Sequence, residues 1–490
     1  MRVNPWLKTA SLAETNQIWS LDLSYDYDLI CIGSGPAGQR CAIQAAKLGK
    51  NVAVIENRQC VGGVCLETGT IPSKTFREAV RSFMVRRSHD SGLGFARRVK
   101  PEAADLLKRV SEVIQYETGV QTDQLQRNDV NIILGKASFV DPHSVLVETD
   151  TGSRTLKAEK ILVAVGARPA KPPNVEPDGQ TVLLSDGVTH LSKLPKTLAV
   201  VGAGVIGIEY ASMFAALGIE VTVIDRRDRP LEFLDNEIID ELIHQMRDMR
   251  VTFRLGETVK SLKVVGNGRS RGRLNLDSGK HIVSDSILYS IGRQGATDTL
   301  ALGAAGLEAD NRGRLKVDEY FRTGVEHVYA AGDVIGFPSL AATSGEQGRL
   351  AACHMFDVDA QPMPDHFPIG IYAIPEISMV GATEQKLTDE NVPYEIGLAR
   401  YREIARGQII GDENGLLKLI FHRKDNRLLG AHAIGSGATE LIHIGQAVLR
   451  LGGGLEYFLQ TVFNYPTLAE CYKVAALNAA NKLRRGLVAV

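Results

Sequence analysis

A strand–glycine loop–helix–strand unit that occurs twice limits what this chain can fold into. Apolar runs at residues 29–32 and 198–201 each enter a GxGxxG loop, which opens a helical stretch and a second apolar run ending in an acid. The interval from the first glycine to the acid is 23 residues in both copies. The residues of this pattern are Gly33, Gly35, Gly38 and Glu56 in the first copy and Gly202, Gly204, Gly207 and Asp225 in the second.

The pattern suits a dinucleotide. The first glycine allows a tight turn, the second allows close approach of a pyrophosphate, and the third allows close helix–strand packing. The helix N-terminus offers unpaired N–H groups to the phosphates, and the acid accepts hydrogen bonds from ribose hydroxyls. One glycine loop alone would be weak evidence, but the repeated context predicts two dinucleotide-binding folds.

Length and composition exclude several other classes. A chain of 490 residues suggests three domains at roughly 150 residues each. The net charge of −1 gives no basic excess for nucleic acid or an anionic membrane, and no apolar run approaches the roughly 18 residues of a membrane span. Residues 1–24 are read as an extension without the apolar core of a signal peptide.

The six cysteines do not form a disulfide scaffold, and neither a paired CxxC nor an HExxH motif is present. We therefore expect no metal site, and a reducing cytoplasm fits best. The two C-terminal histidines, His432 and His443, lack metal-ligand spacing and are interpreted as core or surface residues.

Three further segments resemble the pyridine nucleotide–disulfide oxidoreductases: CVGGVCLETGTIPSK at 60–74, AVGARP at 164–169 and YAAGD at 329–333. The resemblance covers nearly the whole chain after residue 25. It implies FAD on the first fold, with Glu56 at the adenosine ribose and Asp333 at the ribityl chain, and a nicotinamide cofactor on the second. The glycines that it adds are Gly62, Gly63, Gly166 and Gly332 for FAD and Gly292 for NAD(P).

The expected fold class is α/β, with two Rossmann-like domains, one inserted in the other, and a C-terminal α+β dimerisation domain. The FAD-binding domain is expected from residues 25–171 and 296–366, and the NAD(P)-binding domain from 172–295. A Pro-rich stretch at 168–173 marks the crossing point. Residues 367–490 would form the interface of a homodimer, with a long helix from about Thr467 to Leu483.

The chain departs from the disulfide-reducing members at two places. Cys65 is kept, but Thr70 stands where the second cysteine of the redox pair would be, and a hydroxyl cannot form a disulfide. In place of a His-Pro-Thr-x-x-Glu pattern the chain has Tyr465 followed by Glu470, and a phenol with a pKa of about 10 does not replace an imidazole base. Cys60 has the same spacing from Cys65, but it precedes the glycines and is expected at the pyrophosphate end.

These departures resemble one branch of the family, whose members exchange hydride between pyridine nucleotides. The reaction implied is NADPH + NAD⁺ giving NADP⁺ + NADH, with both nucleotides using one pocket in turn. Asp225 favours NAD(H), whereas Arg226 and Arg227 favour NADP(H) through phosphate contacts. Lys74 and Glu209 are expected to pair beside the flavin, as the matching residues do in the family.

Tyr465 and Glu470 would reach the flavin of the partner subunit, although Tyr465 as a core aromatic is an equal alternative. Two other functions remain open on the sequence. One is an NAD(P)H:quinone or diaphorase-type reductase, because a flavin without a dithiol can also reduce small acceptors. The other is a non-catalytic flavoprotein that senses the nucleotide balance.

Overall fold

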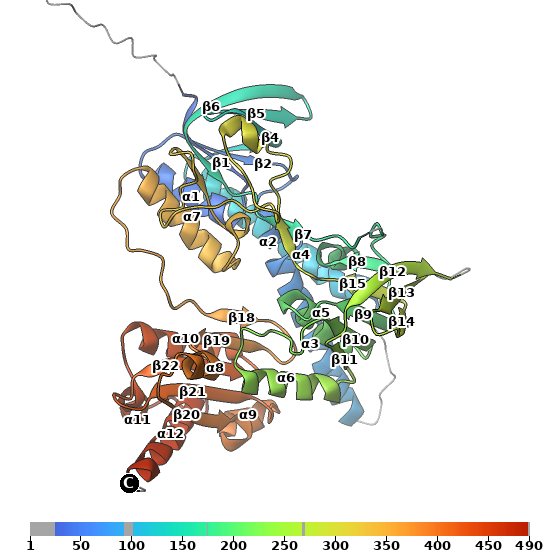
Figure 1. The fold of residues 1–490 in the computed structure, drawn as a ribbon, viewed down its shortest axis with the longest axis vertical. Coiled ribbons are helices and arrows are strands. Elements are labelled where there is room, and N and C mark those ends of the chain that lie inside the picture. The colour runs from blue at the N-terminus through green and yellow to red at the C-terminus, as the bar shows by residue number, and fades with distance from the viewer. Residues whose placement is uncertain (1–24, 93–100, 174, 267–269, 489–490) are drawn as a thin grey trace, which may run out of the picture.

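The computed structural model describes residues 25–92, 101–173, 175–266 and 270–488, so the extension predicted for residues 1–24 lies outside the described part. Three bodies follow one another along the long axis (Figure 1). The first and second bodies are each built on a parallel sheet, and the third on an antiparallel sheet.

The first body centres on a seven-stranded sheet in the order β3-β2-β1-β6-β5-β4, with β17 also paired to β6. The long strand β6 pairs in parallel with β1 and β17 through its C-terminal half and antiparallel with β5 through its N-terminal half. The strands are β1 (Tyr27–Ile32), β2 (Val52–Glu56), β3 (Asn131–Leu134), β4 (Lys136–Asp141), β5 (Ser144–Thr149), β6 (Gly152–Val163) and β17 (Val328–Ala330).

Two helices, α1 (Pro36–Lys47) and α7 (Ala341–Met355), cover one face of this sheet. They pack so closely that a side chain at Gly348 would lie 2.0 Å from the carbonyl oxygen of Ala37. Because β17 and α7 follow the second body in sequence, the chain leaves the first body and returns to it.

The second body repeats this architecture. Its five-stranded sheet has the order β11-β10-β9-β15-β8 and carries a three-stranded antiparallel sheet, β12-β13-β14. The strands are β8 (Val182–Leu184), β9 (Thr197–Val201), β10 (Glu220–Asp225), β11 (Thr252–Leu255), β12 (Val259–Val265), β13 (Arg271–Leu276), β14 (His281–Ser284) and β15 (Ser286–Tyr289). Its helices are α5 (Val205–Ala216) and α6 (Asn236–Asp248).

The crossings between the first two bodies form a small sheet of their own. Strand β7 (Ala167–Pro169) carries the chain out and strand β16 (Arg293–Gly295) carries it back, and the two pair antiparallel. The Pro-rich stretch therefore begins at this link.

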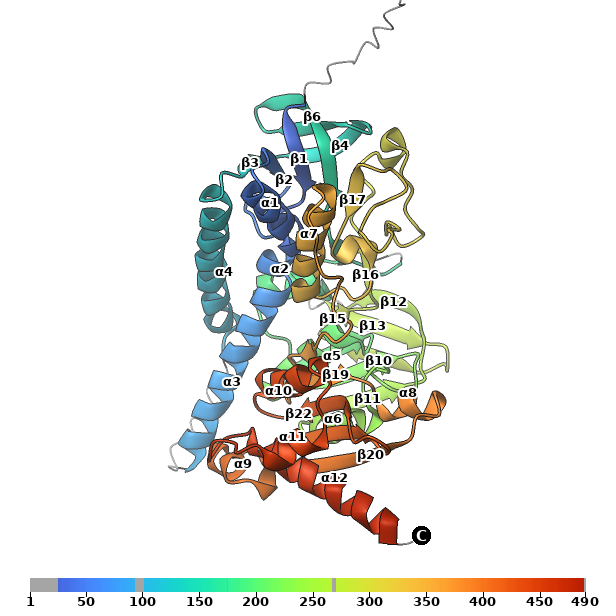
Figure 2. The same cartoon turned by 90° about the vertical axis from the view of Figure 1, so that its left-hand side faces the viewer.

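Helix α3 (Thr70–Gly92) runs from the first body toward the C-terminal one, with α4 (Ala103–Gln126) beside its first half (Figure 2). It begins at Thr70, so Pro72 and Ser73 lie in its first turn and Lys74 follows them in the same helix. Phe76 and Val80 on α3 share one apolar core with α5 and with residues of the C-terminal sheet.

The C-terminal body is a five-stranded antiparallel sheet in the order β18-β19-β22-β21-β20. Its strands are β18 (Ile369–Ile371), β19 (Ile377–Gly381), β20 (Tyr394–Arg400), β21 (Leu416–His422) and β22 (Leu428–Ile434). Its helices are α8 (Glu384–Asp389), α9 (Ala405–Ile410), α10 (Ala438–Arg450), α11 (Leu455–Gln460) and α12 (Glu470–Val488). Helix α12 begins at Glu470 and not at Thr467, because residues 465–467 form bends and residues 468–469 form a turn.

A buried lysine joins the second body to the C-terminal one. Lys418 on β21 has no solvent exposure and donates to Asp235 at 2.8 Å, to Glu237 at 3.0 Å and to Glu384. Asp235 also caps α6 by accepting from the backbone N–H of Glu237. His432 lies against this group, and burial lowers its pKa even though Asp235 acts in the opposite direction. Within the described ranges, no helix has the length and apolar character needed to cross a membrane.

Candidate active site

Both glycine loops have the same backbone geometry. Gly33 and Gly202 have φ of +104° and +106°, and a Cβ on either would lie 2.4 or 2.5 Å from the carbonyl oxygen of Ala164 or Ser290. The third glycines pack equally closely, since a Cβ on Gly38 or on Gly207 would lie 1.9 Å from the carbonyl oxygen of the first glycine.

The middle glycine of each loop borders open space, unlike the closely packed first and third glycines. A Cβ on Gly35 or on Gly204 would meet no protein atom within 4 Å. Each lies just before a helix N-terminus, so the open space faces N–H groups that lack partners within the helix. This is the arrangement that a pyrophosphate requires.

The two acids face the loops. Glu56 accepts from the backbone N–H of Ser34 at 3.0 Å and from its hydroxyl at 2.5 Å. Asp225 accepts from the backbone N–H of Ala203 at 2.6 Å. Each acid therefore lies against its glycine loop, and its contact with an adenosine ribose stays a prediction.

A cavity of about 920 Å³ joins the first loop to the end of the first sheet; we call it the first cavity. The predicted residues that line it are Gly33, Gly35, Glu56, Gly63, Cys65, Thr70, Lys74, Gly166, Glu209, Gly332 and Asp333. Gly38 and Gly62 lie behind this lining, where Gly62, with φ of +115°, begins α2 (Gly63–Glu67) and donates to the Ser34 hydroxyl at 2.8 Å.

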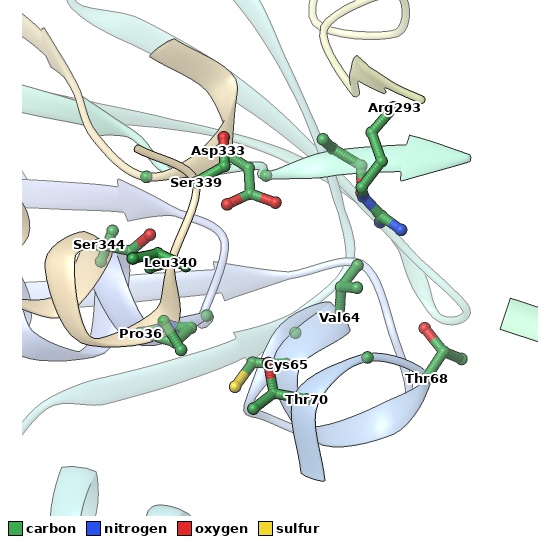
Figure 3. A pocket seen from close by; sticks show the side chains of 18 of the residues that line it. Pro36, Val64, Cys65, Thr68, Thr70, Arg293, Asp333, Ser339, Leu340 and Ser344 are labelled. Atoms are coloured by element: carbon green, nitrogen blue, oxygen red, sulfur yellow. The ribbon is translucent and has the colours of Figure 1, made fainter. Parts of the chain in front are cut away.

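Cys65 and Thr70 lie side by side at one end of the first cavity (Figure 3). Burial raises the pKa of the Cys65 thiol, and although the hydrogen bond from the Thr70 hydroxyl acts in the opposite direction, the net shift is upward. All six cysteines fall within the described residues and are free, and Cys65 is the only one that lines this cavity. Cys60 lies outside the lining.

Lys74 is held by two other bodies. Its ammonium donates to both carboxylate oxygens of Glu209 at 2.8 Å and lies 5.0 Å from the centre of the Tyr372 ring. The backbone N–H of Tyr372 donates to Glu209 at 2.8 Å. Helices α3 and α5 and the loop after β18 thus fix one cation in the cavity wall.

Asp333 points into the same cavity from the start of the short helix η3 (Asp333–Ile335) (Figure 3). Burial raises the pKa of its carboxyl group, and Arg293 on β16 opposes that shift. Thr68, also in the lining, has a buried hydroxyl without a hydrogen-bond partner among the described residues.

A second cavity of about 620 Å³ lies over the second loop. The predicted residues that line it are Gly202, Gly204, Asp225, Arg226, Arg227 and Gly292, with Gly207 behind them. Ser185, Val205 and Ile206 line both cavities, so a ligand extended along the second cavity reaches the Lys74 end of the first.

Tyr465 and Glu470 line neither cavity. The Tyr465 residue is 68% exposed, which rules out the interpretation as a core aromatic of this chain. Glu470 opens α12, and one of its carboxylate oxygens is buried without a described partner. Their contact with a partner subunit stays a prediction.

Sequence reasoning missed several residues of the first cavity. Arg293 and Tyr372 were not assigned roles from the sequence, yet both line this cavity. His443, expected in the core or on the surface, is an exposed residue of α10 at the cavity lining. Nothing local in the sequence indicates these positions, because Arg293 lies on the strand that links the first two bodies and the other two residues belong to the C-terminal body.

Comparison with known proteins agrees with this geometry. The family model described as pyridine nucleotide-disulphide oxidoreductase matches residues 27–348, and the model of the dimerisation domain of that family matches residues 367–476. A protein of Mycobacterium bovis named soluble pyridine nucleotide transhydrogenase is 52% identical over 463 residues, covering 94% of this chain and 98% of its own. A protein of Escherichia coli with the same name is 44% identical over 465 residues, covering 94% and 99%.

Solved structures share the fold. LpdA from Mycobacterium tuberculosis superposes with a TM-score of 0.84 at 26% identity, covering 92% of this chain and 99% of its own. The HOCl-induced flavoprotein disulfide reductase RclA from Escherichia coli has a TM-score of 0.83 at 26% identity, with the same coverage.

Proposed function

The chain belongs to the pyridine nucleotide-disulphide oxidoreductases, and within this family we propose that it catalyses FAD-dependent hydride transfer from NADPH to NAD⁺ without a redox-active disulfide. The observation that carries the proposal is the contact between Cys65 and Thr70. It puts a hydroxyl where a disulfide reductase needs its second sulfur. The names of the two relatives support the same reaction.

The residues present fit FAD in the first cavity. The open space at Gly35 suits its pyrophosphate, Glu56 its adenosine ribose, and Asp333 its ribityl chain. We assign FAD to the body built from residues 25–171 and 296–366, and NAD(P) to residues 172–295. FAD, when bound, supplies a ring that accepts a hydride from one nicotinamide and returns it to another.

The side chains supply position and charge. The second loop and helix α5 bind the pyrophosphate of either nicotinamide dinucleotide, and Val205 and Ile206 lead its nicotinamide end into the first cavity. Lys74, oriented by Glu209, presents a positive charge where negative charge develops. The exchange NADPH + NAD⁺ → NADP⁺ + NADH releases and takes up no proton, so the chain needs no base at position 465.

A homodimer is part of the proposal, with the dimerisation domain as the interface and Tyr465 and Glu470 facing the site of the partner subunit. Four of the six free cysteines are buried, and none is paired. Thiols that are kept free suit a reducing compartment, so we propose the cytoplasm as the location.

The test is an anaerobic two-step reaction of the holoenzyme. One equivalent of NADPH should bleach the flavin absorbance, and NAD⁺ should restore it at a rate compatible with turnover on a thionicotinamide analogue of NAD⁺. Restoration by quinones but not by NAD⁺ would replace the proposal with a diaphorase-type reductase. Failure of every acceptor would favour a non-catalytic flavoprotein.

A further inference from the structure

Resting on the proposed function, we propose that Arg227 caps the charge of Asp225, so that a single ribose pocket accepts both the diol of NAD(H) and the 2′-phosphate of NADP(H). Arg227 is then a specificity-determining residue that acts on the acid as well as on the phosphate. In this view Arg226 and Arg227 have different roles.

The hydrogen bonds of Asp225 use up its capacity as an acceptor. One carboxylate oxygen accepts from the backbone N–H of Arg227 and from its Nε, both at 2.9 Å. The other accepts from Nη2 of Arg227 at 2.7 Å and from the backbone N–H of Ala203 at 2.6 Å. A carboxylate offers about four lone-pair sites, so a ribose hydroxyl must displace the guanidinium to reach Asp225.

The first copy of the same device serves as an internal comparison. Arg58 occupies the matching position, two residues after Glu56, and its backbone N–H donates to Glu56 at 2.9 Å. Its guanidinium, however, forms an ion pair with Glu67 and not with Glu56. Glu56 is thus left without a guanidinium partner, and its three other hydrogen bonds leave one of about four acceptor sites open, as suits a site that holds a ribose diol permanently.

The charged side chains around the second cavity leave a net positive charge, which favours an anionic ligand. Glu257, the other carboxylate in its lining, is paired with Lys280 at 2.8 Å. Arg226 is exposed and forms no ion pair with any described residue. With Asp225 capped by Arg227, one positive charge stays uncompensated at the mouth of the pocket.

Arg227 can serve a phosphate without leaving the acid. A guanidinium has five N–H donors, and Asp225 engages Nε and one N–H of Nη2. The N–H groups that are left point away from the carboxylate and suit charge-assisted contacts with a 2′-phosphate. A bare carboxylate at this place would repel the phosphate instead.

The proposal predicts a specific coupling between two substitutions. Arg227→Ala should weaken a ligand with a 2′-phosphate, both by removing a donor and by exposing the charge of Asp225. Asp225→Asn in the same chain should then recover part of the loss, since it removes that charge. Arg226→Ala should weaken the same ligand without rescue by Asp225→Asn, because Arg226 does not contact the acid.

The experiment measures binding of 2′,5′-ADP and of 5′-ADP to the holoenzyme by isothermal titration calorimetry. These fragments lack nicotinamide, so the result does not depend on whether hydride exchange takes place. For Arg227→Ala we expect about tenfold weaker binding of 2′,5′-ADP, with binding of 5′-ADP unchanged or stronger. Arg229→Ala, which removes an ion pair with Asp240 outside the pocket, is the matched control and should change neither.

The double variant decides the question. If Asp225→Asn with Arg227→Ala binds 2′,5′-ADP at least several-fold more tightly than Arg227→Ala alone, the cap is supported. If the double variant binds it equally or more weakly, Arg227 is only a phosphate ligand and the inference is wrong. Arg227→Gln keeps most of the side-chain volume and should behave as Arg227→Ala does, which shows that the effect does not come from a folding defect. The flavin absorbance of each variant shows that it retains its cofactor.

Discussion

Replacing Thr70 with cysteine should create a disulfide that the native chain lacks. Thr70 opens α3 and its hydroxyl contacts the sulfur of Cys65 in α2, so a sulfur at position 70 would lie beside the Cys65 thiol. Four residues separate the two positions. Closing so short a loop would stabilise the folded state by about 2 kcal/mol in the chain-entropy account.

The expected change can be counted in thiols. The native chain has six cysteines, all free, and should show six thiols whether or not it has been treated with a mild oxidant. Thr70→Cys adds one, which gives seven thiols in the reduced protein. Pairing with Cys65 removes two, so the oxidised variant should show five.

The same change can be counted in electrons. A bound flavin takes up two electrons, which one NADPH supplies, and a disulfide takes up two more. Anaerobic reduction should therefore consume one equivalent of NADPH per flavin in the native protein and two in Thr70→Cys. Thiol titration of the denatured protein and absorbance during reductive titration give the two counts independently.

Thr68→Cys is the matched control. Thr68 lines the same cavity, but its hydroxyl has no described partner, so a sulfur there should stay unpaired. This variant should show seven thiols before and after oxidation and consume one equivalent of NADPH. Seven thiols in oxidised Thr70→Cys would mean that positions 65 and 70 do not meet, and the reason given for the missing dithiol chemistry would be wrong.

Three further outcomes are expected. Lys74→Met should slow flavin reduction by NADPH on the order of 10²-fold, because it removes the cation that Glu209 orients. The affinity for NADPH should change little. A normal rate in stopped-flow measurements would contradict this role of Lys74. Gly204→Ala should leave the melting temperature unchanged but weaken nucleotide binding, because its methyl group enters the open space of the second cavity. Gly207→Ala should destabilise the fold by about 1–3 kcal/mol, because its Cβ would lie 1.9 Å from the carbonyl oxygen of Gly202. Burial lowers the pKa of His432 from 6.5, so the unfolded chain takes up the proton first. The free energy of unfolding, measured by urea denaturation, should therefore fall as the pH drops below 6.5. His432→Asn should make this fall smaller.

The two nucleotide-binding units could be predicted closely from the sequence. Their strands and helices lie within a residue or two of the expected bounds, because apolar runs, glycines and terminal acids are local signals. The pairing of Lys74 with Glu209 was expected from the resemblance and is present at 2.8 Å. The start of α12 was placed three residues too early, since turns after a proline leave only a weak signal in the sequence.

Contacts between bodies could not be predicted. Lys418 interrupts an apolar run on β21, and nothing near it indicates that Asp235 and Glu384, from two other elements, neutralise it in the core. The hydrogen bond from Tyr372 to Glu209 spans 163 positions of sequence. The pairing of Arg227 with Asp225 is local, yet the matching Arg58 pairs elsewhere, so spacing alone could not decide it.

The departures of this chain from a disulfide reductase share one chemical reason. A flavin that passes electrons to a substrate disulfide does so through a pair of cysteines, so a second thiol is required. The reduction also takes up protons, which calls for a side chain that titrates near neutral pH. Hydride exchange between two nicotinamides needs neither, so a hydroxyl at position 70 and a phenol at position 465 carry no penalty. The reaction requires instead that two nucleotides differing by one phosphate occupy one pocket in turn. For that purpose neutralising Asp225 is more effective than removing it, because the acid stays available to a ribose diol once the guanidinium moves.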